Sequence, residues 1–153
     1  MVDALAQPAA RIVVGVDGSA PSKLALRWAD YLARAMGGAQ LRAVIAWHVP
    51  ASYGWPSYPA HWTPEADAER CLIDAVDEVF VGGQPLGMDL AVREGGAAKV
   101  LLEQSRGASM LIVGSRGHGG FTGLLLGSVS MACAEHAGCP VLVVHGDAPP
   151  PGP

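Results

Sequence analysis

The 153-residue chain is predicted to form one α/β domain around a parallel five-stranded sheet with helices on both faces. Two observations lead to this fold class. Five short apolar runs alternate with four longer amphipathic segments, which gives the order β-α-β-α-β-α-β-α-β. Most of the strand-like runs are apolar throughout, as expected for strands of a parallel sheet that is covered on both faces.

The first two strands and the helix between them are clearly marked. Residues 11–16 (RIVVGV) predict the first strand, and residues 41–47 (LRAVIAW) predict the second. Ser19 is a suitable cap for the helix between them, and Gly37 ends that helix. The residues expected on its buried face are Leu24, Trp28, Leu32 and Ala35.

A long connection rich in proline and aromatic residues, 49–63, leads to a second helix that begins at Pro64 and ends at Gly82. The rings of this connection belong to Tyr53, Trp55, Tyr58 and Trp62. The connection is either a lid or partner surface, or a loop that packs its own rings against the second helix. The residues expected on the inner face of the second helix are Ala68, Leu72, Ala75 and Val79.

The second half of the chain contributes three strands and two helices. Residues 88–93 alternate in polarity, which suits a strand at the sheet edge, and residues 97–106 predict a helix. Residues 110–113 (MLIV) predict the fourth strand. The last helix is expected over residues 128–136, and the fifth strand over residues 141–144 (VLVV).

The predicted domain covers residues 11–145. Residues 1–10 are expected to be a flexible N-terminus that does not resemble a secretory signal. The proline-rich residues 146–153 are expected to be a disordered tail, because they have no apolar pattern that would bury them.

Composition restricts the possible functions. Half of the residues are hydrophobic, 16% are charged and the net charge is −4, which predicts a well-cored soluble domain without nucleic-acid or membrane partners. No apolar run approaches the roughly 20 residues of a membrane span. The cysteines, which match no zinc template and are expected to be reduced thiols in the cytoplasm, are Cys71, Cys133 and Cys139.

The segment after the fourth strand, residues 114–130, contains six glycines in the sequence GSRGHGGFTGLLLGSVS. So many glycines are costly to order, which indicates a backbone shaped around a ligand. Three of them, Gly114, Gly117 and Gly127, give the spacing G-x2-G-x9-G-S. Asp17 directly follows the first strand and therefore lies on the same edge of the sheet, where α/β folds bind ligands.

The end of this segment is predicted to bind phosphate. Gly127, Ser128 and Val129 open the last helix, where unpaired N–H groups and the helix dipole favour an anion. Gly114 and Gly117 would let the backbone approach a ligand without a Cβ in the way. The segment fits neither G-x-x-x-x-G-K-[ST] nor G-x-G-x-x-G, which excludes a Walker nucleoside triphosphatase and a dinucleotide-binding domain.

The chain resembles a single-domain universal stress protein over about residues 11–145. The matching parts are IVVGVDGS with Asp17, IVGSRG after the fourth strand, the spaced glycines and the closing CPVLVV. The resemblance implies a sheet of strand order 3-2-1-4-5, an ATP site and a homodimer. One departure is Ser109, which replaces a frequent Asp before the fourth strand and is expected at the edge of the sheet opposite the site.

The resemblance also implies roles for individual residues. Asp17 would bind the ribose or adenine side of ATP, and the backbone of Val44 would meet adenine. Gly114 and Gly117 would border the ribose and phosphates. The phosphates would be held by Gly127, Ser128 and Val129. Arg116 is either a further phosphate ligand or a solvated surface charge.

These features favour ATP capture by a regulatory stress-response protein. No Walker lysine, acidic pair for Mg²⁺ or base placed to activate water is recognised, so little hydrolysis is expected. Any Mg²⁺ would be held by the phosphates of the nucleotide and by water. His118 is not expected to be catalytic, because no acidic or thiol residue lies near it in the sequence to orient it. The alternatives are a slow ATPase, an adenylate-forming or nucleotide-cleaving relative, and a structural dimer without nucleotide.

The composition and the position of the fifth strand predict how the homodimer forms. It is apolar on both faces and, in the order 3-2-1-4-5, lies at the edge of the sheet, where an apolar strand is an aggregation hazard. A second copy that pairs antiparallel about a two-fold axis would cover this edge. The contact would run through Val141, Leu142, Val143 and Val144.

Overall fold

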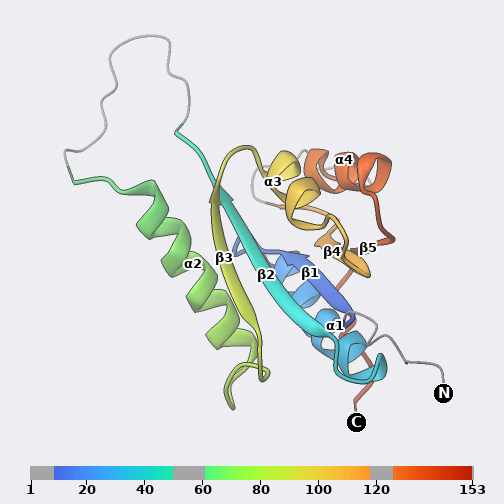
Figure 1. Ribbon diagram of the computed structural model, residues 1–153. Helices are drawn as coiled ribbons and strands as arrows, with labels where there is room; N and C mark the ends of the chain where they lie inside the picture. The colour runs from blue at the N-terminus through green and yellow to red at the C-terminus, as the bar shows by residue number, and fades with distance from the viewer. Residues whose placement is uncertain (1–8, 50–60, 118–125, 153) are drawn as a thin grey trace, which may run out of the picture.

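The computed structural model describes residues 9–49, 61–117 and 126–152, and within these ranges it contains one sheet of five strands and four helices (Figure 1). The alternation of strands and helices predicted from the sequence is confirmed. The strands are β1 (Arg11–Gly15), β2 (Gln40–Trp47), β3 (Asp89–Glu94), β4 (Met110–Gly114) and β5 (Val141–Val144). The helices are α1 (Ala20–Ala35), α2 (Pro64–Val79), α3 (Ala97–Gln104) and α4 (Ser128–His136).

The sheet has the order β3-β2-β1-β4-β5, and its neighbouring strands are all parallel, as predicted. The chain builds outward from β1 through β2 to β3, then crosses back and adds β4 and β5 on the other side of β1. The direction of building therefore reverses between β1 and β4. In open α/β sheets this reversal leaves a crevice at the carboxyl ends of the two strands, where ligands bind.

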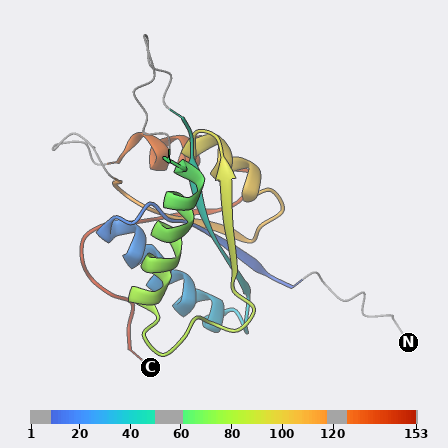
Figure 2. The same ribbon diagram turned by 90° about the vertical axis from the view of Figure 1, so that its left-hand side faces the viewer.

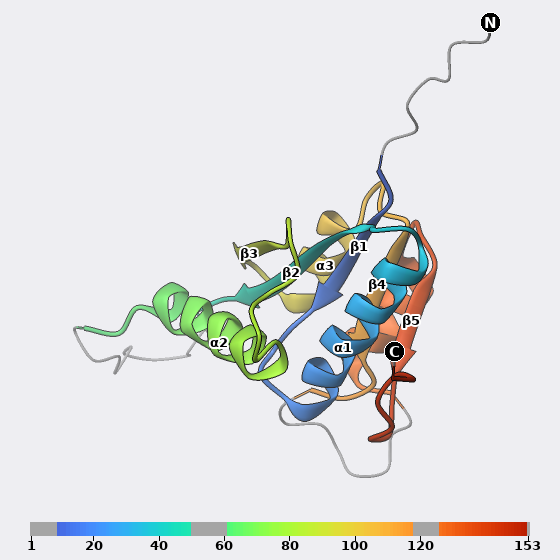
Figure 3. The same ribbon diagram turned by 90° about the horizontal axis from the view of Figure 1, so that it is seen from below.

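Helices cover both faces of the sheet. The helices α1 and α2 lie beside each other on one face, and α3 and α4 cover the other (Figures 2 and 3). Because successive side chains of a strand point to opposite faces, Ile12 and Val14 of β1 enter the first core, whereas Val13 enters the second. All three are fully buried, which explains why β1 lacks polar residues at its centre.

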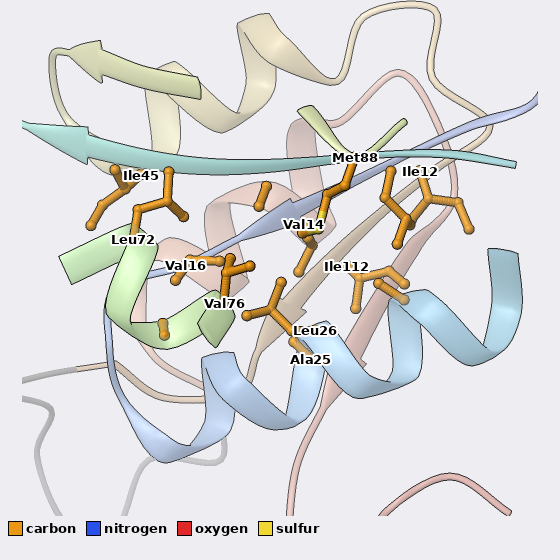
Figure 4. Packing of buried hydrophobic residues seen from close by; sticks show 14 of the residues in the cluster. Ile12, Val14, Val16, Ala25, Leu26, Ile45, Leu72, Val76, Met88 and Ile112 are labelled. Carbon is orange, nitrogen blue, oxygen red and sulfur yellow. The ribbon is translucent and has the colours of Figure 1, made fainter. Parts of the chain in front are cut away.

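The core under α1 and α2 is the larger of the two (Figure 4). In this core, Leu26 of α1 and Leu72 of α2 pack with the strand residues Val14 and Ile112, and each of the four is at most 1% exposed. The opposite core is formed by Leu101 of α3 and Cys133 of α4 with residues of β1 and β4. Together the two cores fix the carboxyl ends of β1 and β4, where the site lies.

The orientation of α1 differs from the prediction. Leu24 is buried as predicted and Leu32 packs partly buried against the same core, whereas Ala35 is exposed. The other buried side chains of the helix include Ala25, Leu26, Ala29 and Ala33. The alanines let the helix approach the sheet closely, so the buried face lies to one side of the stripe of larger residues. Trp28 is only partly buried at the margin of this face, and its Nε1 donates to the carbonyl of Ala148 over 3.3 Å.

The helix starts follow the sequence signals with one exception. The Ser19 side chain caps α1 by accepting from the N–H of Ser22, and Gly37 follows the helix with φ +82°. Thr63 occupies the cap position of α2 without a side-chain hydrogen bond. There the fixed φ of Pro64 at the first helical position provides the start signal.

Several predictions fall on residues that the structure does not describe or does not test. Residues 1–8 lie outside the described ranges, as do Tyr53, Trp55 and Tyr58 of the aromatic connection and His118 of the glycine-rich segment. Trp62 is described, is partly buried, and donates from Nε1 to Asp67 Oδ2 over 3.1 Å. The domain boundaries remain predictions. In the described ranges, no helix is long and apolar enough to cross a membrane.

Candidate functional site

A cavity of about 360 Å³ opens at the carboxyl ends of β1 and β4, at the point where the strand order reverses. All eight residues predicted to bind nucleotide line it, which are Asp17, Val44, Gly114, Arg116, Gly117, Gly127, Ser128 and Val129. The structure therefore brings together residues that are up to 112 positions apart in the chain. Sequence reasoning missed the other lining residues, which are Gly15, Val16, Ser22, Ala46, Ala97, Leu101, Val113 and Ser130.

One wall of the cavity is apolar. Val44 of β2, Leu101 of α3 and Val113 of β4 are each at most 5% exposed and line this wall with the small residues Ala46 and Ala97. The Val44 backbone, which was expected to meet adenine, has a carbonyl that already accepts from the N–H of Val16 over 2.8 Å. Such a wall suits a flat apolar group, because burial of that group would release water from both surfaces.

Asp17 stands at the turn from β1 into α1, where a set of short-range hydrogen bonds holds it. Its Oδ1 accepts from both the N–H of Ser19, over 2.9 Å, and the Ser19 hydroxyl. Its own N–H donates to Ser22 Oγ over 3.3 Å, and that hydroxyl donates to the Ser19 carbonyl over 2.9 Å. Since Ser19 and Ser22 are both nearly buried, the turn is closely held before any ligand binds.

The first two motif glycines both face this turn. A Cβ on Gly114 would lie 2.8 Å from the carbonyl carbon of Pro21 and 3.0 Å from the nitrogen of Ser22. A Cβ on Gly117 would collide with Asp17 Oδ2. Gly114 therefore allows β4 to pass close to the first turn of α1, and Gly117 leaves room for the Asp17 carboxylate.

The opposite end of the cavity is formed by the start of α4. Gly127 is the cap residue, with the extended backbone angles φ −70° and ψ 166°, and no side chain caps this helix. The N–H groups of Ser128, Val129 and Ser130 are in the first turn, where helix geometry provides no partner within the helix. This turn also carries the positive end of the helix dipole and so favours an anion.

A buried serine fixes the start of α4 to the end of β4. Ser130 is 2% exposed, and its hydroxyl lies 3.0 Å from each of the carbonyl oxygens of Ser115 and Gly127. The Ser115 carbonyl also accepts from the N–H of Gly127 over 2.6 Å. These contacts close the base of the glycine-rich segment, although its residues 118–125 lie outside the described ranges.

The charges of the site are few. Of the described residues that line the cavity, Asp17 is the carboxylate and Arg116 the cation, and Arg116 is exposed. Within the described ranges, no group of three or more His, Cys, Asp or Glu residues could hold a metal ion. Outside the cavity lining, burial in the core beneath α3 and α4 raises the pKa of the Cys133 thiol to about 11, so this thiol stays protonated near neutral pH.

The sequence matches a known protein family over most of its length. A model of the universal stress protein family matches residues 9–145. A universal stress protein of Mycolicibacterium smegmatis is 35% identical over 144 residues, which are 89% of this chain and 48% of that protein. The chain thus spans about half the length of the curated relatives that it matches.

Two solved structures have the same fold. A universal stress protein in complex with cAMP is 28% identical, with a TM-score of 0.64 over 91% of this chain and 98% of that chain. A universal stress family protein from Arabidopsis thaliana with AMP bound is 20% identical, with a TM-score of 0.54 over 88% of this chain and 90% of that chain. Family match, fold and clustered motif residues agree, and the chain belongs to the universal stress protein family.

Proposed function

We propose that the chain binds an adenine nucleotide, with ATP as the cellular ligand, and that it acts as a regulatory stress-response protein in the cytoplasm. One observation carries this proposal. A single cavity combines an apolar wall, the Asp17 carboxylate and the first turn of α4, which are the groups that a base, a sugar and a phosphate chain require. Its volume of about 360 Å³ lies in the range of small-molecule sites, roughly 300–1,000 Å³.

Each part of the nucleotide has a matching part of the cavity. The apolar wall at Val44 and Leu101 suits adenine, and Asp17 suits a hydroxyl or amino donor. The N–H groups at the start of α4 suit phosphate, and the Arg116 guanidinium adds positive charge to that part of the lining. Mg²⁺ would bind through the phosphates and water, because the described lining offers no acidic pair.

The relatives support the same ligand class. The solved relative at 28% identity is a complex with cAMP, and cAMP shares its adenine and ribose with ATP. Calorimetry with ATP, AMP and cAMP on the purified protein therefore tests the proposal, and we expect a dissociation constant in about the micromolar range for ATP. Mass spectrometry of the nucleotide that copurifies with the protein identifies the cellular ligand. Absence of binding by all three nucleotides would leave the structural-dimer alternative.

Replacing Ser128 with proline is expected to weaken ATP binding by about tenfold to a hundredfold. Proline removes the N–H at the first position of α4, where its fixed φ suits the helix and the extended Gly127 precedes it without strain. The control is Ser128→Ala, which keeps the N–H and loses only the hydroxyl. Calorimetry should separate the two variants, and equal affinities would contradict phosphate binding at this helix start.

Hydrolysis of ATP by the pure protein is expected to be far slower than the median enzyme turnover of roughly 10 per second. No lysine is among the described lining residues, and Asp17 already uses one carboxylate oxygen to accept from Ser19. Phosphate release from ATP and Mg²⁺ measures this directly. A turnover near the median value would instead favour the ATPase alternative.

We also propose that two copies associate through β5. This strand is at the edge of the sheet, opposite β3 (Figure 3). Val141, Leu142 and Val143 are only partly buried, and no charged residue interrupts the strand. Pairing with a second β5 would cover this apolar edge and satisfy its free backbone groups.

A further inference from the structure

We propose that Ser19 and Gly117 are positioning residues that fix Asp17 Oδ2 at the edge of the cavity. This inference rests on the proposed function, because it concerns how Asp17 contributes to nucleotide binding. It assigns the two residues a role that acts through Asp17 and requires no contact of their own with the ligand. Three observations support it, namely the bonds to Oδ1, the clearance around Oδ2 and the chemistry of the cavity.

Ser19 restrains the Asp17 carboxylate from one side. Both its N–H and its hydroxyl donate to the same oxygen, Oδ1. The hydroxyl also accepts from the N–H of Ser22 over 3.4 Å, so its own direction is set by the first turn of α1. Two donors on Oδ1 hold the carboxylate in one orientation and leave Oδ2 as the oxygen that can accept from a ligand.

Gly117 provides the space for that second oxygen. A Cβ at position 117 would collide with Oδ2, and among the described residues that are not its chain neighbours only the Asp17 carboxyl group lies within 4 Å of it. An alanine here would therefore displace the Asp17 carboxylate in particular. This role adds to the expectation that the glycine lets the backbone approach the ligand.

The charge of Asp17 determines which part of a nucleotide it can face. A carboxylate accepts hydrogen bonds and repels phosphate, so its partner must be a hydroxyl or amino donor. The start of α4 lines the same cavity and attracts phosphate. An oriented Oδ2 would thus set the direction in which the nucleotide lies, and a carboxylate that is ordered before binding costs less to immobilise.

The test is a pair of double-mutant cycles measured by calorimetry with ATP. Ser19→Ala and Gly117→Ala are each expected to reduce the affinity by about tenfold, the value of a hydrogen bond to a charged group. In the Asp17→Ala background, neither substitution should reduce it further. Asp17→Ala removes both the acceptor that Ser19 orients and the oxygen that a Cβ at 117 would meet.

Matched controls separate this role from a loss of stability. Ser105→Ala removes the hydroxyl of a serine that is also buried and that donates to the Leu102 carbonyl, away from the cavity lining. Gly82→Ala adds a Cβ that meets no atom within 4 Å. Both controls should retain wild-type affinity for ATP, and thermal unfolding of every variant records its stability. Ser19→Ala is expected to lower the unfolding temperature as well, since it also removes the cap of α1.

The outcomes distinguish this inference from the proposed function. If the wild type binds no adenine nucleotide, the proposed function fails and the inference fails with it. The wild type could instead bind ATP while Ser19→Ala or Gly117→Ala lowers the affinity for ATP by the same factor with and without the Asp17 carboxylate. That result would overturn the positioning role alone. A crystal structure of Gly117→Ala gives a measurement independent of affinity. In that structure, the hydrogen bond from the Ser19 hydroxyl to the Asp17 carboxylate should be lost. Retention of this hydrogen bond would overturn the role of Gly117.

Discussion

Replacing Gly114 with alanine is expected to lower the free energy of unfolding by about 1–3 kcal/mol, the usual cost of overpacking a close contact. The new Cβ would lie 2.8 Å from two atoms of Pro21 and 3.0 Å from the backbone nitrogen of Ser22. These atoms belong to the first turn of α1 and cannot move aside by a change of rotamer. Either β4 or the start of α1 must therefore shift.

The third motif glycine provides the control. A Cβ on Gly127 would meet atoms no closer than 3.4 Å, and the backbone φ of −70° is one that alanine adopts readily. Gly127→Ala should cost less than about 1 kcal/mol, the scale of an altered helix cap. Urea denaturation followed by circular dichroism compares the two. Equal losses of stability would mean that β4 and α1 are packed less closely than described.

Much of the fold could be predicted from the sequence because its signals are local. The apolar run VLVV forms β5 over the predicted residues 141–144, and the last helix spans the predicted residues 128–136. Asp17 and Gly114 could be placed on one edge of the sheet because each follows a strand, and parallel strands share their carboxyl edge. Such inferences need only the order of elements along the chain.

The rest depends on tertiary contacts that no local pattern reveals. Ser130 lines the cavity because its hydroxyl reaches back to Ser115, and a serine inside a helix gives no signal of this. Leu101 resembles any core leucine until α3 is placed on β1. The role of Gly117 could not be predicted because it requires knowing where the Asp17 carboxylate lies. The buried face of α1 was predicted only in part, because Leu24 is buried as expected but Ala25, Ala29 and Ala33 face the sheet and Ala35 is exposed.

Replacing Val143 with proline is expected to convert the proposed homodimer into a monomer. In the ladder between β4 and β5, Leu111 N–H donates to the Pro140 carbonyl and Ser115 N–H donates to the Val144 carbonyl. Because the bonding direction alternates along a parallel strand, the N–H and carbonyl of Val141 and Val143 point away from β4. Proline at 143 therefore removes a donor from the outer edge and leaves the bonds to β4 in place.

The matched control is Val143→Ala. The Val143 side chain packs against the core beneath α3 and α4, so both substitutions lose that contact, but only proline loses the N–H. Light scattering after size-exclusion chromatography should show a dimer for the wild type and for Val143→Ala. For Val143→Pro it should show a monomer, or precipitation of the exposed edge. If Val143→Pro is a soluble dimer with an unchanged affinity between subunits, the interface must lie elsewhere than in β5.

The same variant separates assembly from nucleotide binding. No residue of β5 is among the described residues that line the cavity. A two-fold contact through β5 is therefore expected to leave the described cavity of each subunit intact. Monomeric Val143→Pro should bind ATP with an affinity close to that of the wild type, measured by calorimetry at the same protein concentration. A large loss of affinity in a folded monomer would show that the partner subunit completes the site.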